Sequence, residues 1–479
     1  MLRAGKLAII IAAIWVPLPL AAVETAASPV RPAITWRPCP ENNAVDCGTI
    51  TVPLDWSHPY GPGIDLSLAR RRATDPAARV GSLLFNWGGP GAPSVDPLIL
   101  NDSTGFSPEL ERRFDIVGWD TRGVGRSPIL CSAGVVEPIF TRLTGRLPAN
   151  QAEFDQITAL SRQLFADCRA HTGPMFDHVD TLNTVRDLEA IRAALGEHKL
   201  TYYGSSYGSL IGQQYAERFP HRVRAIALDG VVDHSLDTTS YWRTTAAAVQ
   251  DSFNEFVAWS DRTPESPLHG QDVRAIWHEL LDRAAEPEIL IGTAYGFFNE
   301  PDWSGLARLF ADLHAGSPVP GKTLHENGSE PIAFPALIFC ADFSLPIRDY
   351  RELKAQLRNA AQVAPDMQYF PEAPAASLAC SGAPTPIPNP QHRLRVRDAS
   401  TPLLLVNAVH DPTSGYAWAT EVARQLGDDG VLLTYDGWGH HAYRRAGACV
   451  DDAIDNYLLA QRIPERGTHC PADQGPRIR

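Results

Sequence analysis

The sequence lacks the features of several protein classes. Lys and Arg number 42 against 55 Asp and Glu, and this shortage of positive charge, a formal net charge of −13, disfavours a nucleic-acid partner. Beyond the amino-terminal segment no apolar run is long enough to span a bilayer, which argues against stable membrane insertion. None of the eight cysteines forms a C-x-x-C pair, and the helical stretch 278–282 lacks the second His of a zinc-protease helix. We therefore predict neither a metal nor another cofactor.

The amino-terminal segment has the pattern of a secretory signal peptide. Arg3 and Lys6 precede an apolar run at residues 7–16, and two prolines and several alanines follow, up to residue 27. The alternative, a membrane anchor, needs about 20 uninterrupted apolar residues, and the run is too short for that. We therefore expect residues 1–27 to be cleaved and the mature protein to be secreted or extracytoplasmic.

All eight cysteines lie in the predicted mature protein. An even number of cysteines outside the cytoplasm indicates disulfides, although eight cysteines allow 105 pairings. Because several cysteines are close along the chain, we expect neighbours to pair. The expected pairs are Cys39 with Cys47, Cys131 with Cys168, Cys340 with Cys380, and Cys449 with Cys470.

Apolar runs alternate with helical patterns from about residue 80 onward, which predicts a doubly wound, mainly parallel α/β sheet. The runs are nearly continuous in Val, Ile and Leu, as in strands that are buried on both faces. In such sheets ligands bind beyond the carboxyl ends of the strands, so the residues that follow the runs are candidate site residues. The runs are 81–85, 114–119, 200–203, 223–228, 402–406 and 431–435, and the residues at or just past their ends are Trp87, Asp120, Ser206, Asp229, Asp411 and His440.

The alternation lapses between about residues 236 and 366, where helix-like stretches carry several tryptophans. We interpret this region as a helical cap inserted into the α/β core, although packing within the cap explains any single aromatic residue there better than substrate contact does. The expected organisation is a first part of the core at 28–235, a cap at 236–375 and a second part of the core at 376–479.

A G-x-S-x-G motif lies between an apolar run and a helix rich in small residues, and it is formed by Gly204-Ser205-Ser206-Tyr207-Gly208. In a nucleophile elbow of this form, a strand turns sharply into a helix, and flanking glycines let the backbones pass closely. The motif predicts that Ser206 is the nucleophile of a serine hydrolase.

A serine nucleophile needs a base and a carboxylate that orients the base. His440 follows the run at 431–435 within a glycine-containing loop, with the adjacent His441 as its rival. Asp411 follows the run at 402–406, and the chain order Ser, Asp, His is that of α/β-hydrolases. Asp229 is a second candidate acid, but we prefer Asp411 and interpret Asp229 as structural.

The acyl-transfer intermediate also needs backbone amides that hold the oxyanion. The Gly-Gly-Pro-Gly motif at residues 88–91 follows an early strand, where hydrolases of this type place one donor. We predict the N–H of Gly89 as this donor and the N–H of Tyr207 as the second. The loop at 120–127 resembles a dinucleotide-binding loop only superficially, and we interpret it as a brace for the site.

Taken together, these residues resemble the secreted tripeptidyl aminopeptidases of the α/β-hydrolase fold, which are relatives of proline iminopeptidase. The resemblance covers most of the mature chain. It includes the motifs at 46–48, 88–91, 120–127 and 204–208, the helix at 187–192, and a carboxyl-terminal region from about Cys380 to Cys470. It implies a serine exopeptidase that releases short peptides from free amino termini, with the triad Ser206, Asp411 and His440.

The chain departs from this family around the oxyanion loop. Trp87 stands where relatives often have Pro, and it is expected to narrow or line the substrate pocket. In proline iminopeptidases acidic cap residues hold the substrate ammonium, which suggests Glu255, Asp302 and Asp342 as candidates here. The sequence does not determine the oligomeric state.

Two other functions compete with the aminopeptidase. A secreted carboxylesterase uses the same triad with an apolar acyl pocket, for which Trp87 and Phe298 are candidates. A binding protein that has lost catalysis is disfavoured because serine, acid, histidine and the Gly-Gly-Pro-Gly motif are all present. An aminopeptidase requires a free amino terminus on its substrate, whereas an esterase does not.

Overall fold

The computed structural model describes residues 33–317 and 331–472. The predicted signal peptide at residues 1–27 lies outside the described residues. In the described part of the chain, no helix combines the length and the apolar character that a membrane span requires.

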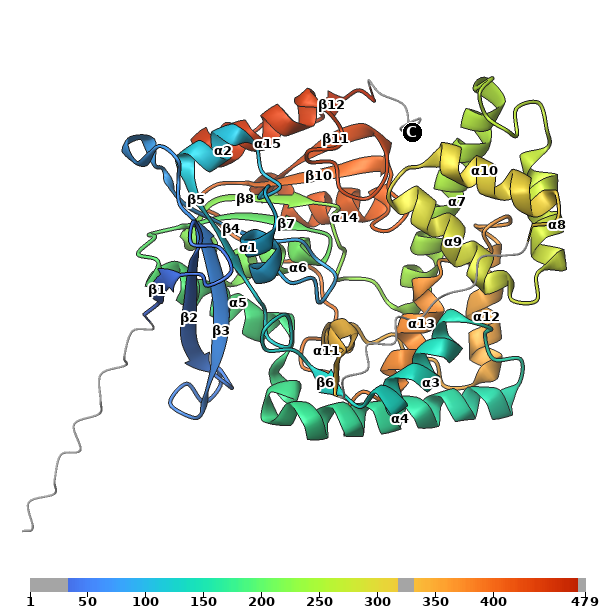
Figure 1. The fold of residues 1–479 in the computed structure, drawn as a ribbon, viewed down its shortest axis with the longest axis horizontal. Helices are drawn as coiled ribbons and strands as arrows, with labels where there is room; N and C mark the ends of the chain where they lie inside the picture. Colours follow the sequence, from blue (N-terminus) through green and yellow to red (C-terminus); the bar gives the residue numbers. More distant parts are fainter. Residues whose placement is uncertain (1–32, 318–330, 473–479) are drawn as a thin grey trace, which may run out of the picture. The chain divides into compact units, whose positions relative to one another are not determined.

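The core is built on a ten-stranded sheet (Figure 1). Its first three strands pair antiparallel with their neighbours, whereas the seven strands from β5 onward pair in parallel. This order is that of an α/β-hydrolase sheet extended at both edges. Across the sheet the strands are β1 (Thr35–Pro38), β2 (Asp46–Pro53), β3 (Gly63–Arg71), β5 (Phe114–Trp119), β4 (Gly81–Asn86), β7 (Leu200–Ser205), β8 (Val223–Asp229), β10 (Leu403–His410), β11 (Gly430–Trp438) and β12 (His469–Cys470).

The six runs predicted from apolar character form strands β4, β5, β7, β8, β10 and β11. Every residue of β4, β5 and β7 is buried, as expected for strands with helices on both faces. Strands β1 to β3 were not predicted, because buried and accessible positions alternate along β2 and β3 and no continuous apolar run marks them. The longer observed β10 places Asp411 directly after its last residue.

Helices cover both faces of the sheet and contribute to two separate apolar clusters. One face carries α1 (Val95–Leu100), α2 (Pro108–Arg113) and α15 (Ala448–Ala460), and the other carries α5 (Thr181–Ala194), α6 (Tyr207–Arg218) and α14 (Tyr416–Leu426). Packing between the helices and the sheet fixes the positions of the carboxyl ends of the parallel strands, and the loops at those ends carry the candidate site.

The remaining helices form a layer beyond these strand ends, which we call the helical layer (Figure 1). The helical layer includes the predicted cap region and also residues 133–172. Both segments contribute to one buried apolar cluster, to which the cap supplies Trp242, Trp277 and Trp303. The sheet resumes only at Leu403, so the second part of the core begins later than residue 376. The layer consists of α3 (Ala133–Thr144), α4 (Gln151–Thr172), α7 (Thr238–Arg262), α8 (Val273–Arg283), α9 (Pro287–Asn299), α10 (Trp303–His314), α11 (Phe339–Asp342), α12 (Tyr350–Ala361) and α13 (Glu372–Ala379).

Four disulfides join the cysteines that are neighbours along the chain, in the pairs that the spacing suggested. Two lie in the α/β core and two in the helical layer. They are Cys39–Cys47, Cys449–Cys470, Cys131–Cys168 and Cys340–Cys380. This set of disulfides fits an oxidising compartment.

Candidate active site

Ser206 occupies the sharp turn between β7 and α6. Its backbone angles, φ 55° and ψ −122°, lie outside the regions that non-glycine residues favour. Close packing fixes the turn, because a Cβ on Gly204 would lie 2.3 Å from the carbonyl oxygen of Gly208, and one on Gly208 would lie 2.4 Å from that of Asn86. The two glycines of the motif are therefore required by sterics, and Ser206 is presented beyond the strand end as the motif predicts.

His440 and Asp411 form a buried pair. The imidazole Nδ1 of His440 lies 2.9 Å and 3.1 Å from the two carboxylate oxygens of Asp411. Asp411 also accepts hydrogen bonds from the backbone N–H of Thr413 and from both the N–H and the hydroxyl of Ser414. These contacts fix the carboxylate and assign the proton of the neutral imidazole to Nδ1.

The other ring nitrogen of His440, Nε2, is buried and has no hydrogen-bond partner among the described residues. With Nδ1 protonated, this nitrogen is an acceptor. Gly230, at the end of β8, makes room for the ring, because a Cβ there would lie 3.0 Å from the His440 Cε1. The arrangement leaves a basic nitrogen free for a proton that comes from outside the Asp411 pair.

The two adjacent histidines have different electrostatic environments. Burial opposes protonation of His440, but the Asp411 carboxylate outweighs it, and the pKa of His440 is raised above the ordinary 6.5. Burial and the neighbouring His440 lower the pKa of His441 well below that value. His441 contacts the hydroxyl of Ser205 rather than a carboxylate. The geometry therefore favours His440 over His441 as the base.

Asp229 holds the loop that carries the two histidines. Its carboxylate accepts hydrogen bonds from the hydroxyl of Tyr203 at 2.9 Å and from the backbone N–H groups of Ala442 and Tyr443 at 2.8–3.0 Å. His440 is bonded to Asp411 instead. The structural interpretation of Asp229 agrees with these contacts.

The predicted oxyanion donors lie beside Ser206. Gly88 and Gly89 have φ angles of 97° and 105°, and a Cβ on Gly88 would lie 2.8 Å from the Cβ of Ser206. Within the described part of the chain, neither the N–H of Gly89 nor that of Tyr207 has a protein acceptor. Two backbone donors without acceptors are thus available close to the serine.

Hydrogen bonds connect the loop at 120–127 to a neighbouring segment, in agreement with the structural role expected for it. The carboxylate of Asp120 accepts hydrogen bonds from the backbone N–H groups of Ser94, Val95 and Arg126 at 3.0–3.1 Å. It therefore connects the loop at 120–127 to the segment that follows the Gly-Gly-Pro-Gly motif.

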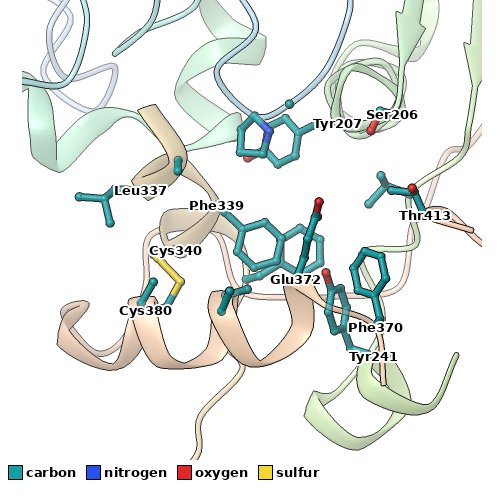
Figure 2. Close-up of a pocket in the computed structure, with 18 of the residues that line it drawn as sticks. Ser206, Tyr207, Tyr241, Leu337, Phe339, Cys340, Phe370, Glu372, Cys380 and Thr413 are labelled. Carbon is teal, nitrogen blue, oxygen red and sulfur yellow. A yellow bond between two sulfur atoms is a disulfide. The ribbon is translucent and has the colours of Figure 1, made fainter. Parts of the chain in front are cut away.

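A cavity of about 350 Å³ opens at Ser206 (Figure 2). Its walls are largely apolar and come from the oxyanion loop, the elbow and the helical layer. Among the described residues, the acidic one that lines it is Glu372, in the first turn of α13. Other lining residues include Gly89, Tyr207, Tyr241, Phe339, Phe370 and Thr413.

The carboxylate of Glu372 projects into the cavity between Phe339 and Thr413, on the side toward Ser206 (Figure 2). The side chain of Glu372 is exposed to the cavity, and the protein atoms around the cavity partly desolvate its carboxyl group. This desolvation raises the pKa of Glu372, while the charge of His440 acts in the opposite direction. A carboxylate in this position attracts a cationic group on any molecule bound next to Ser206.

The structure corrects the expected substrate-binding residues. Trp87 does not line the cavity, because it packs against Phe85, Phe106 and Tyr203 with ring centroids 5.2–5.5 Å apart. The altered oxyanion loop therefore places this aromatic ring on the side away from the pocket.

The expected acidic anchors are corrected too. Glu255 accepts from the indole Nε1 of Trp438 at 3.1 Å, and Asp302 caps the amino terminus of α10. Asp342 is fully buried among hydrogen-bond donors. Glu372 lines the cavity instead, and the sequence analysis did not single it out. The sequence feature that could have pointed to Glu372 is an acidic residue between Phe370-Pro371 and a segment rich in alanine.

The pH dependence tests the His440–Asp411 pair. Because the base must be neutral and Asp411 raises the pKa of His440, kcat/KM should fall as the pH drops through a value above 6.5. Asp411→Asn should lower that apparent pKa and reduce kcat by roughly 10³- to 10⁴-fold. A pH–rate profile of both proteins measures the shift. An acid limb at the same pH in both would contradict the assignment.

Comparisons with known proteins show which proteins this chain is similar to. A family model described as TAP-like protein matches residues 367–470. Serine protease Hip1 of Mycobacterium tuberculosis is 30% identical, over 91% of this chain and 91% of that protein. Tripeptidyl aminopeptidase of Streptomyces lividans is 28% identical, over 95% and 90% respectively. Carboxylesterase B of Mycobacterium tuberculosis is 30% identical, over 93% and 92%.

Proposed function

Because the chain belongs to the TAP-like family of α/β-hydrolases, we propose that it is a secreted serine aminopeptidase that releases short peptides from free amino termini. The observation that carries this proposal is the carboxylate of Glu372 in a largely apolar cavity that opens at Ser206. An esterase has no need of a negative charge there, whereas a peptidase that recognises an ammonium group does.

The catalytic cycle follows from the proposed roles. Ser206 attacks the scissile carbonyl carbon while His440 Nε2 accepts its proton, and Asp411 stabilises the resulting imidazolium. The carbonyl oxygen becomes an oxyanion that accepts hydrogen bonds from the N–H groups of Gly89 and Tyr207. His440 then protonates the leaving amine, which leaves an acyl-enzyme on Ser206. Water, activated by His440, hydrolyses this ester and restores the serine.

Glu372 supplies the selectivity for a free amino terminus. An ammonium group that enters an apolar cavity loses hydration, and this cost is offset only by a counter-charge or by hydrogen bonds. The carboxylate provides both, and the faces of Tyr241, Phe339 and Phe370 add cation–π attraction. An acetylated amino terminus carries no charge and gains neither contribution.

The cavity also limits the substrate. A volume of about 350 Å³ is near the lower end of the range for small-ligand pockets, so only a short amino-terminal segment fits between Glu372 and Ser206. The apolar walls favour uncharged side chains on that segment. We therefore expect a preference for short, apolar amino-terminal sequences.

Glu372→Gln tests the proposal with nearly unchanged shape. It should lower kcat/KM for a tripeptide anilide with a free amino terminus by about 10- to 100-fold, the value of a charge-assisted hydrogen bond. Hydrolysis of the N-acetylated twin should change little. Steady-state kinetics on both substrates gives the selectivity ratio.

Glu255→Gln is the matched control, because this acid lies in the helical layer and contacts Trp438 outside the cavity. Its selectivity ratio should equal that of the wild type. If Glu372→Gln also kept the wild-type ratio, the amine-anchor role would be refuted.

A carboxylesterase remains the second candidate, and the apolar walls of the cavity favour it. This function predicts rapid hydrolysis of a short-chain nitrophenyl ester together with inertness toward both anilides. Glu372→Gln would then leave ester hydrolysis unchanged or accelerate it, since a charge in an apolar acyl pocket opposes a neutral acyl chain.

We further propose an extracytoplasmic location. The four disulfides and the signal-like pattern of residues 1–27 support it. The substrates are then peptides present outside the cytoplasm.

A further inference from the structure

Tyr207 makes two kinds of contact at once. Its backbone N–H, directly after the nucleophile, is the second proposed oxyanion donor. Its side chain is buried, and the hydroxyl contacts the carboxylate of Asp342 and the Thr181 hydroxyl, which lies 3.1 Å away. The side chain of this donor residue is thus bonded to an acidic group of the helical layer.

Asp342 is the centre of a buried network. Its carboxylate accepts hydrogen bonds from the N–H and hydroxyl of Thr181 at 2.9 Å each and from the side-chain amide of Asn389. Its backbone carbonyl accepts from His234 at 2.7 Å. Burial, reinforced by the nearby charge of Asp180, raises the pKa of Asp342 to about 7. The residue has no contact with the cavity, so it does not bind the substrate amine.

The short helix α11 that ends at Asp342 connects several parts of the site. Phe339 and Cys340 line the cavity, and the Cys340–Cys380 disulfide ties α11 to the end of α13, which carries Glu372 in its first turn (Figure 2). The contact of Asp342 with Tyr207 adds the elbow to this set. One element therefore touches the oxyanion donor residue, the pocket wall and the helix of the amine anchor.

We propose that Asp342 is a positioning residue. Its contact with the Tyr207 hydroxyl fixes the position of Tyr207, and with it the second oxyanion donor, relative to the helical layer. The inference rests on the proposed acyl transfer at Ser206 but not on the choice between peptide and ester substrates. The N–H of Tyr207 lies at the first position of α6 and has no intrahelical acceptor, so the hydrogen bond of its side chain supplements the backbone constraints. A small displacement of this donor weakens the bond to the oxyanion more than the binding of the substrate.

Removal of the contact should therefore lower kcat rather than raise KM. Tyr207→Phe deletes only the hydroxyl and keeps the backbone N–H, and we expect kcat to fall about 10-fold or more with KM nearly unchanged. Asp342→Ala should cause a similar or larger loss. The two effects should be less than additive in the double variant, because both remove the same contact.

Asp342→Asn should restore most of the activity. Its amide oxygen still accepts from Thr181 and Asn389, and its NH₂ group donates to the hydroxyls of Tyr207 and Thr181, which can rotate to accept. Asp366→Ala is the matched control, because this buried carboxylate bonds Gln250, Arg274 and His278 within the helical layer and does not contact the elbow. It should leave kcat unchanged.

All variants are assayed on a nitrophenyl ester as well as on the free tripeptide anilide, since both reactions form an oxyanion. A kcat loss on both substrates supports the proposal, even if the aminopeptidase function were wrong. The proposal is overturned if Tyr207→Phe keeps the wild-type kcat, or if KM rises at constant kcat. If Asp342→Ala does not fold, the comparison of Tyr207→Phe with Asp342→Asn decides.

Discussion

Ser206→Ala should abolish nearly all activity, with kcat reduced by roughly 10⁵- to 10⁶-fold, because the nucleophile itself is lost and only substrate positioning and the oxyanion donors remain. Stability should change little, since the Ser206 hydroxyl has no hydrogen-bond partner in the described part of the chain. The measurement is kcat on a tripeptide anilide, together with a thermal melt.

Covalent labelling gives an independent readout of the same residue. A serine-directed fluorophosphonate should add one adduct to the wild type, on the tryptic peptide that contains Ser206, and none to Ser206→Ala. Ser205→Ala is the matched neighbour, since Ser205 contacts His441 and not the proposed base. It should keep the label and most activity. Wild-type labelling at another residue, or more than a small residual activity in Ser206→Ala, would remove Ser206 from its proposed role.

The two adjacent histidines should differ greatly in their effects. His440→Ala should lower kcat by roughly 10⁴- to 10⁶-fold, because the base that receives the serine proton is lost. His441→Ala should cost less than about 10-fold, because among the described residues its ring packs against His440 and its one hydrogen-bond partner is the Ser205 hydroxyl. Parallel kinetics on both variants measures the difference.

Folding must be checked for both histidine variants, because both side chains lie in the loop that Asp229 holds. Similar melting temperatures would assign the difference in kcat to chemistry. Equal, mild losses in the two variants would contradict the assignment of His440 as the base.

The strands of the core were predictable because burial on both faces leaves a signal in the sequence, a continuous run of Val, Ile and Leu. Strands β2 and β3, the second and third strands of the sheet, alternate instead, and no continuous apolar run marks them. The candidate site residues can be located in the sequence for a related reason. Ser206 and Asp411 come directly after strands, and His440 follows β11 by one glycine. Their positions in the chain therefore already predict that all three lie at the carboxyl ends of the parallel strands.

The walls of the pocket were not predictable in this way. They come from helices whose packing depends on many weak apolar contacts, and no local pattern records which side chain faces the cavity. Asp342 and Glu372 illustrate the problem, because both are acidic residues near aromatic ones. Asp342 faces hydrogen-bond donors in the interior, whereas Glu372 faces the cavity. Only the three-dimensional arrangement distinguishes them.

For the same reason, the sequence alone does not show that residues 133–172 pack in the helical layer. These helices precede the elbow in the chain and resemble crossover helices of an α/β sheet. The disulfide Cys131–Cys168 and the packing of Phe154 and Leu164 in the apolar cluster of the layer assign them there. The packing of a long insertion between strands is therefore a better guide than its place in the chain to whether it belongs to the core or to the helical layer.

The most direct test of the central claim is identification of the products that the wild-type enzyme forms from an unlabelled peptide of about ten residues, prepared with a free and with an acetylated amino terminus. Mass spectrometry at successive times should show the free peptide shortened from its amino end by short fragments and the acetylated peptide intact. Internal cleavage, equal cleavage of both peptides, or no cleavage of either by an enzyme that hydrolyses a nitrophenyl ester would contradict the account.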